Sequence, residues 1–234
     1  MAGKQETYDS VPGGRLYTSN DMVKVGCGDC EGCSTCCEGM GQSVVLTPWD
    51  VFQMVRGSGK TVTELFQDFI EFHVEEGMIV PNLQMTEERD ACVFLSAQGR
   101  CMIHPFRPGI CRLFPLGRKY GEKGGEKSGE FCGEPEISYF LLEDSCPKEN
   151  KSKVKVKKWL DVSELKEYEK FLGAWYTFCR KVKAKLTETA DEDWKKKANL
   201  YVLQSFYFRG YESEKGFYGL MEERMAQAAD VLEL

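Results

Sequence analysis

The sequence predicts an α+β fold that is mostly helical, with a cysteine-rich N-terminal region of short strands and a helical layer at the C-terminus. Three observations support this prediction. Residues 27–37 contain five cysteines, residues 80–116 hold short β-like runs broken by Gly and Pro, and apolar residues recur at steps of three and four after Ser163. The chain is therefore expected to combine a centre built on sulfur with a helical scaffold.

The chain divides into three predicted parts. Residues 1–26 lack periodicity and are expected to form an extended, partly disordered lead-in. Residues 27–147 contain ten of the eleven cysteines and form the predicted cysteine-rich, metal-binding domain. Residues 160–234 form a helical region packed on it. The lysine-rich stretch between the two, Lys148–Lys158, is expected to be a solvated linker.

Composition excludes several classes of function. Of the 234 residues 42% are hydrophobic and 12% aromatic, so the chain is globular and long enough to bury a core. The net charge of −6 argues against nucleic acid as a partner, and no apolar run is long enough to cross a membrane. The N-terminus has neither the basic start nor the apolar run of a signal peptide, so a cytoplasmic location is expected.

The segment CGDCEGCSTCC places Cys27, Cys30, Cys33, Cys36 and Cys37 within eleven residues. A C-x2-C step lets two thiolates converge on one centre, as in zinc knuckles and iron–sulfur sites. The residues between the cysteines are small or polar and allow the backbone to turn tightly around an ion. Because Cys36 and Cys37 are adjacent, binding of both to one ion would strain the backbone, so we expect them to have different roles.

A disulfide-stapled secreted domain is the alternative explanation of this cysteine density. The odd number of cysteines, the lack of a signal sequence and the length of the chain argue against it. Only two histidines are present, His73 and His104, so metal ligation must depend on sulfur, and a Cys–His catalytic pair is not expected.

Two helices are predicted directly after the cysteine segment. Thr47 resembles an N-cap, followed by Pro at the first helical position, and this helix should stop near Gly57. Thr61 and Glu64 resemble a capping box, and the apolar residues that follow suggest a helix that includes Phe72.

Short strands and a loop are predicted for the remainder of this domain. Their residues are β-branched, aromatic or bounded by Gly and Pro. The expected strands are Ser43–Leu46, Cys92–Leu95 and Cys101–Ile103, and the expected surface loop is 117–130.

Three helices are predicted for the C-terminal region. An apolar stripe runs from Leu165 to Leu186, and similar spacing predicts helices over 191–209 and 213–232. Cys179 lies on the first stripe and is expected to be a small buried hydrophobe rather than a ligand.

Several motifs in a fixed order carry a family resemblance. They are C-x2-C-x2-C-C at 30–37, Thr-Pro-Trp-Asp at 47–50, Cys-Val-Phe-Leu at 92–95, Gly-Arg-Cys at 99–101 and Arg-Pro-Gly-Ile-Cys-Arg-Leu-Phe-Pro at 107–115. The pattern resembles the CxxCxxCC cysteine-cluster family, whose YkgJ-like members are described as zinc- or iron-chelating. The flagellin lysine N-methylase of bacteria carries a similar cluster.

The resemblance covers about residues 27–116 and implies a set of thiolate ligands. Cys27 and Cys132 are additional thiols whose role it leaves open. The implied ligands are Cys30, Cys33, Cys36, Cys37, Cys92, Cys101, Cys111 and Cys146.

The metal is open between an iron–sulfur cluster of the 4Fe-4S type and zinc, since both suit thiolates. Cys146 precedes a proline, an arrangement similar to bacterial ferredoxins that favours iron modestly. Arg107 and Arg112 flank Cys111 and are expected either to offset thiolate charge or to pair with acidic residues. His104 is expected to pack rather than to ligate.

Three functions are compatible with these features. The first is a metal-binding protein whose centre holds the N-terminal part of the chain together. The second is a protein-lysine N-methyltransferase resembling the flagellin enzyme, although no GxGxxG loop follows a strand. The third is a non-catalytic, zinc-stabilised module whose helices bind a protein partner. The last two imply a protein substrate or partner.

Overall fold

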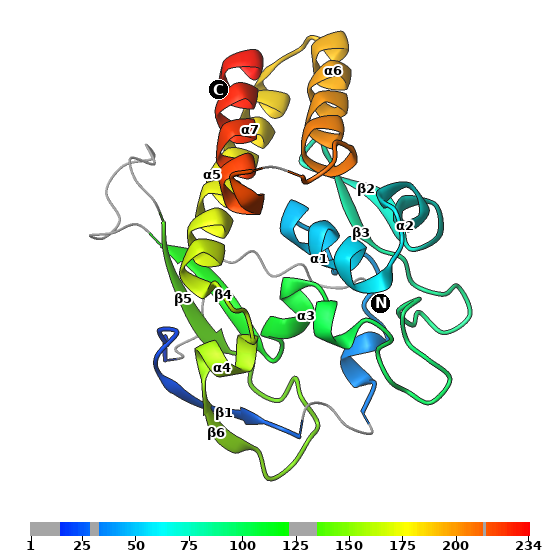
Figure 1. Cartoon of the computed structure of the whole chain (residues 1–234), viewed down its shortest axis with the longest axis vertical. Coiled ribbons are helices and arrows are strands. Elements are labelled where there is room, and N and C mark those ends of the chain that lie inside the picture. The colour runs from blue at the N-terminus through cyan, green and yellow to red at the C-terminus, as the bar shows by residue number, and fades with distance from the viewer. Residues whose placement is uncertain (1–14, 29–32, 122–134, 213) are drawn as a thin grey trace.

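The computed structural model describes residues 15–28, 33–121, 135–212 and 214–234. Helix makes up 46% and strand 20%, which confirms the mostly helical α+β class. Within the described ranges the strands form three separate antiparallel pairs, β1–β6, β2–β3 and β4–β5 (Figure 1). The strands are β1 (Met22–Gly26), β2 (Ile70–Glu75), β3 (Met78–Leu83), β4 (Leu116–Gly121), β5 (Glu136–Leu141) and β6 (Ser152–Lys155).

The helices fall into two groups, short ones around the cysteines and long ones at the C-terminus. The helices are α1 (Pro48–Ser58), α2 (Val62–Asp68), α3 (Gly109–Leu113), α4 (Val156–Leu160), α5 (Leu165–Glu188), α6 (Glu192–Leu203) and α7 (Gly216–Leu232). The 3-10 turns are η1 (Thr35–Cys37) and η2 (His104–Phe106), and a π-helical turn, η3 (Gln204–Phe208), continues α6.

The predicted N-cap at Thr47 and the predicted capping box at Thr61 and Glu64 are both present, and Thr47 also forms a capping box, with Asp50. The carboxylate of Asp50 accepts a hydrogen bond from the Thr47 backbone at 2.7 Å, and Glu64 accepts one from Thr61 at the same distance. The predicted extension of the second helix through Phe72 is wrong, because α2 ends at Asp68 and β2 follows. A two-residue turn with positive φ at both positions folds β2 back onto β3, and hairpin pairing replaces the helix.

The three short runs predicted as strands form only isolated bridges. Val45 pairs with Asn82, Met85 with Cys92, and Leu95 with Cys101. Each run is bent by neighbouring Gly, Pro or turn residues before a second pair forms. These bridges fold the chain closely around the cysteines.

The lead-in and the lysine-rich stretch, both expected to lack regular structure, pair with each other as β1 and β6. Val23 and Val25 on β1 are buried in a small core with Val156 and Leu160, while the lysines between them face solvent. The alternation of valine and lysine is a strand pattern, and the high lysine content obscured it. Most of the predicted loop 117–130 lies outside the described residues.

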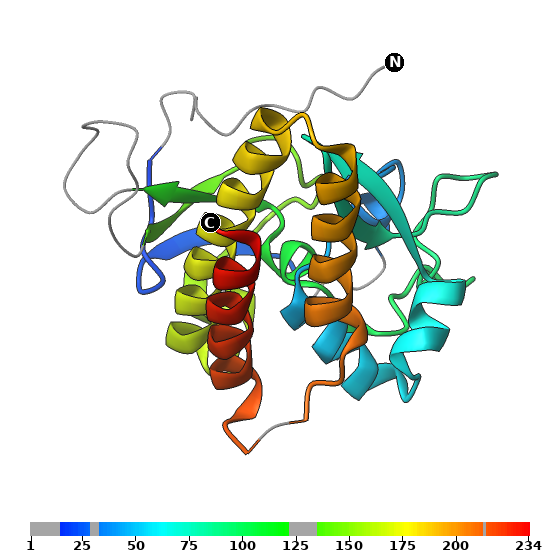
Figure 2. The same ribbon diagram turned by 90° about the horizontal axis from the view of Figure 1, so that it is seen from above.

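The C-terminal helices form one layer, with α5 and α7 side by side (Figures 1 and 2). The main core joins Trp49 and Leu83 of the cysteine-rich part to Trp175 and Phe206 of the helical part. Cys179 packs against this core, as predicted. In the described part of the chain, no helix is both long and apolar enough to cross a membrane.

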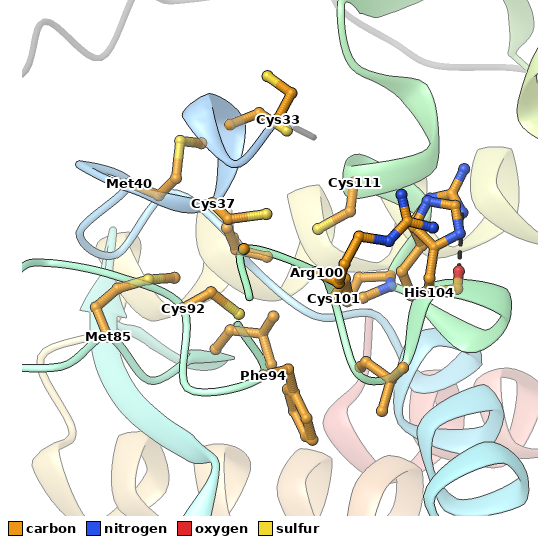
Figure 3. Close-up of a pocket in the computed structure, with 17 residues that line it drawn as sticks. Cys33, Cys37, Met40, Met85, Cys92, Phe94, Arg100, Cys101, His104 and Cys111 are labelled. Carbon is orange, nitrogen blue, oxygen red and sulfur yellow. Dashed lines mark hydrogen bonds between the residues drawn. The ribbon is translucent and has the colours of Figure 1, made fainter. Parts of the chain in front are cut away.

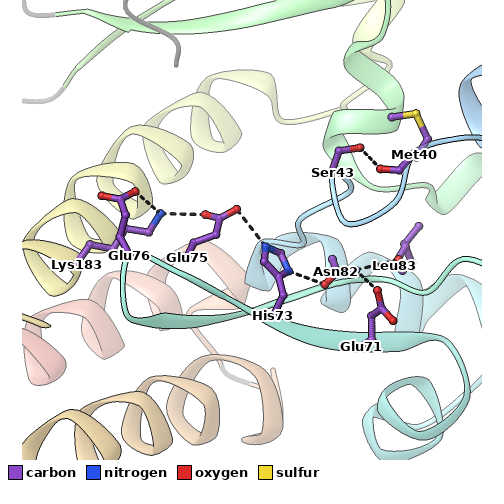
Figure 4. Close-up of polar contacts among 9 residues, drawn as sticks. All are labelled: Met40, Ser43, Glu71, His73, Glu75, Glu76, Asn82, Leu83 and Lys183. Atoms are coloured by element: carbon purple, nitrogen blue, oxygen red, sulfur yellow. Dashed lines mark hydrogen bonds and ion pairs between the residues drawn. The ribbon is translucent and has the colours of Figure 1, made fainter. Parts of the chain in front are cut away.

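A polar network fastens the β2–β3 hairpin to α5 (Figure 4). Lys183 donates to Glu75 at 2.9 Å and to Glu76 at 3.2 Å, while His73 contacts Glu75 at 3.2 Å and Asn82 at 2.7 Å. Burial alone would raise the pKa of Glu75, but the ammonium of Lys183 and its hydrogen bond hold that pKa below its ordinary value.

We predict that Lys183→Met lowers the free energy of unfolding by about 1 kcal/mol at pH 7. Since the folded pKa of Glu75 is depressed, the stabilisation is complete above the ordinary Glu pKa and is lost as pH falls through the folded value. The difference between the two proteins should therefore shrink in acid, measured by urea unfolding at several pH values. Lys195→Met, which removes an exposed pair with Glu192, is the control and should change little. A difference that is constant with pH would contradict the assignment.

Candidate metal centre

Six cysteines from separate parts of the chain line one cavity (Figure 3). Its volume is about 60 Å³, several times the roughly 10–15 Å³ that one water molecule requires. Across it the thiols of Cys37 and Cys111 point toward each other. The six are Cys33, Cys36, Cys37, Cys92, Cys101 and Cys111.

Backbone hydrogen bonds bring the first two cysteine segments together. The amide of Cys92 donates to the carbonyl of Cys37 at 2.7 Å, and the amide of Gly39 donates to Asp90 O at the same distance. A bridge between Leu95 and Cys101 then folds the loop back, so Cys101 reaches the same cavity. The thiols converge through main-chain contacts that do not depend on the sulfur atoms.

The third segment is placed by Asp50. Its Oδ1 accepts a hydrogen bond of 2.6 Å from the amide of Gly109, the first residue of α3, while its Oδ2 caps α1. A Cβ at Gly109 would lie 2.0 Å from the hydroxyl of Tyr168 on α5, so only glycine fits there. This contact orients α3 and directs Cys111 into the cavity.

Burial and neighbouring thiols act together on the proton affinity of the cluster. Burial raises the pKa of Cys92, Cys101 and Cys111, and for Cys111 the neighbouring cysteines and Asp50 raise it further. Two effects raise the pKa of Cys36, the hydrogen bond with Cys37 and, as the smaller of the two, burial. Cys33, which is partly exposed, differs, since the hydroxyl of Thr35 lowers its pKa. These buried thiols are protonated at neutral pH unless a cation replaces the protons.

The two arginines beside Cys111 have different roles. Arg107 lines the cavity, and its positive charge acts on Cys101. Arg112 is only 4% exposed and donates to the carbonyls of Pro105, Arg107 and Asp161, so it braces the backbone. Its guanidinium also lies 3.9 Å from the Asp161 carboxylate. The Arg112 side chain therefore points away from the thiols.

His104 contacts Arg107. Its Nδ1 lies 2.9 Å from Arg107 Nη1, which also donates to the His104 carbonyl at 2.8 Å. The residue lines the cavity beside Cys101 (Figure 3). That His104 packs and does not ligate stays a prediction.

Apolar side chains complete the cavity, and sequence reasoning missed them. Val44, Leu83 and Phe94 are buried residues of the main core, so the cavity is continuous with that core. Met40 and Met85 close one side (Figure 3). The only sequence signal for these residues was their closeness to cysteines, since Met40 lies three residues after Cys37.

The remaining predicted ligands lie elsewhere. Cys30 and the additional thiol Cys132 fall outside the described residues. Cys146 and Cys27 do not line the cavity, and the carbonyl of Cys146 accepts a hydrogen bond from Lys151. The nine described cysteines are free thiols, without a disulfide among them. Within the ranges that the structure covers, no three His, Cys, Asp or Glu side chains are arranged to hold an ion.

The donor set nevertheless fits a soft metal. Thiolate sulfur is the preferred ligand of zinc and of iron–sulfur clusters. The lining residues Arg100 and Arg107 supply positive charge that would offset an excess of thiolate.

Comparison with known proteins gives one match. Residues 29–133 match the model of the family CxxCxxCC, described as a putative zinc- or iron-chelating domain. No curated protein and no solved structure matches the chain significantly.

We predict that Asp50→Ala lowers the free energy of unfolding by about 2–4 kcal/mol, because it removes a helix cap and leaves the Gly109 amide buried without an acceptor. Glu64→Ala is the control. It removes the equivalent carboxylate of the capping box from an exposed helix end and should cost only about 1 kcal/mol. Urea unfolding measures both. Equal losses in the two variants would mean that the Asp50–Gly109 bond contributes nothing.

Proposed function

We propose that the protein binds zinc or an iron–sulfur cluster through thiolates of the cysteine cavity, because residues 29–133 match the model of the CxxCxxCC family. One observation carries the proposal: six thiols from three segments line a single cavity within the protein core. A C-x2-C step before Cys33 adds Cys30 as a seventh ligand candidate. Cys146, followed by proline, is the eighth candidate.

The proposed role of the metal is to hold the cysteine segments and the core together. Four neutral thiols contribute little to folding, whereas a bound metal joins segments far apart in sequence and adds its binding free energy to stability. The chain supplies more thiols than the four that one tetrahedral ion takes, so two centres, a cluster, or bystander thiols are the arrangements to be distinguished.

Two finer functions remain predictions. Protein-lysine N-methyl transfer comes from the family resemblance, and binding of a protein partner comes from the helical C-terminal region. Iron with acid-labile sulfide in the purified protein would make a methyl-transfer assay worthwhile. Zinc without colour would direct attention to the partner that the helical layer binds. A cytoplasmic location stays an expectation.

We predict that Cys37→Ser, Cys92→Ser and Cys111→Ser each lower the metal content of protein purified without oxygen and without added metal. Elemental analysis, acid-labile sulfide and the visible absorption spectrum are the measurements. Cys179→Ser is the matched control, since this cysteine lies on α5 outside the cavity. The Cys179→Ser protein should therefore keep the metal content of the wild type. If a cavity variant misfolds, the wild type supplies a second test. Wild-type protein that has been denatured without metal should refold when zinc, or iron with sulfide, is added. Metal-replete, folded cavity variants would contradict the proposal.

We predict that metal binding releases protons, because burial raises the pKa of Cys92, Cys101 and Cys111 and thiols must ionise to ligate. Zinc titration of the metal-free protein at pH 7, followed calorimetrically in buffers of different ionisation enthalpy, counts the protons. Affinity should fall as pH decreases. Binding without proton release would mean that oxygen ligands, and not these thiols, hold the metal.

A further inference from the structure

A second, larger cavity shares a wall with the cysteine cavity. Its volume is about 740 Å³, within the roughly 300–1,000 Å³ typical of small-molecule sites. The wall is the segment 104–112. His104 and Cys111 line the cysteine cavity, while their neighbours Pro105 and Arg112 line the second one, which we call the basic groove.

The basic groove carries positive charge in a chain whose net charge is −6. It is lined by five basic and two acidic side chains. Arg112 donates to backbone carbonyls and Lys215 pairs with Glu223, so these two are engaged. Arg56, Lys157 and Lys158 are exposed and form no ion pair within the described part of the chain.

Two long helices begin at the groove. Glu164 and Lys215, the N-cap residues of α5 and α7, both line it, and neither side chain caps its helix. The first backbone N–H groups of a helix carry a partial positive charge that favours anions. The two helix ends and the basic side chains therefore favour the same kind of ligand.

Two aromatic residues of the groove pack against neighbouring side chains. Trp49 contacts Tyr168, with ring centroids 4.4 Å apart, and the Arg112 guanidinium lies 5.9 Å from its ring. Phe52 stacks on Phe217 at 4.8 Å, and the Arg56 guanidinium lies 5.3 Å from its ring. The proposal therefore depends on the charge and size of the groove.

We propose that the basic groove binds a small organic phosphate of about nucleotide size. The volume exceeds the needs of an inorganic anion, and lysine side chains with helix N-termini are the groups that bind phosphate. This site is separate from the metal centre and stands whether or not the metal proposal holds.

Adenosine diphosphate is the probe for this site, measured by isothermal titration calorimetry on the full chain as purified. We expect saturable binding that the double variant Lys157→Gln/Lys158→Gln weakens about tenfold or more, as loss of two phosphate contacts requires. Lys153→Gln/Lys155→Gln removes the same charge from β6, outside the groove, and should bind like the wild type. Gln53→Trp fills the groove without a change of charge and should abolish binding.

Four results would overturn the proposal. The first three are the absence of saturable binding, equal weakening by both lysine pairs, and inorganic phosphate that binds as tightly as the nucleotide. The fourth is binding of an Asp- and Glu-rich peptide in place of adenosine diphosphate, which would identify a protein docking surface. None of these results affects the metal content, so failure here is distinguishable from failure of the metal proposal.

Discussion

The buried carboxylate of Asp50 is the interaction on which the cysteine cavity depends. One oxygen caps α1 and the other holds the Gly109 amide, which joins two segments 59 residues apart. The hydroxyl of Tyr168 on α5 lies against Gly109, so the helical layer fixes the same point from outside. Burial raises the pKa of Asp50, yet its hydrogen bonds oppose that effect. One polar contact therefore links the first helix after the cluster, the last cysteine segment and the C-terminal helices.

Charge explains why a metal site built on these thiols would use an arginine as well. Thiols gathered in an apolar cavity resist ionisation, because each thiolate loses hydration and repels the next. A metal ion removes that penalty, and the Arg107 charge beside Cys101 reduces what remains. Arg112, which follows Cys111 in the sequence, supports the cavity through its hydrogen bonds to the backbone. It holds the carbonyls of Pro105 and Arg107 in place, so the wall of the cavity keeps its shape.

Local signals in the sequence predicted much of the fold and part of the site. The N-cap at Thr47, the capping box at Thr61 and Glu64, the long apolar stripe of α5 and the dense cysteine segment are recognisable within a few neighbouring residues. The β1–β6 pair and the β2–β3 hairpin were missed because lysines masked one pattern and an apolar run suited helix and strand alike. The Asp50–Gly109 bond and the opposite directions of Arg107 and Arg112 arise from tertiary packing. No local pattern contains that information.

The shared wall couples the two cavities to the extent that metal binding orders it. Segment 104–112 carries Cys111 on the cysteine side and Arg112 on the groove side, and Pro105 and Pro108 limit its backbone freedom. If metal binding fixes this segment, it also fixes one wall of the groove. The binding of a groove ligand then costs less conformational entropy, because that wall is already ordered. By linkage the ligand must favour metal binding to the same extent. The size of this coupling depends on how far the wall loosens without metal, because an already rigid wall would leave the two sites independent.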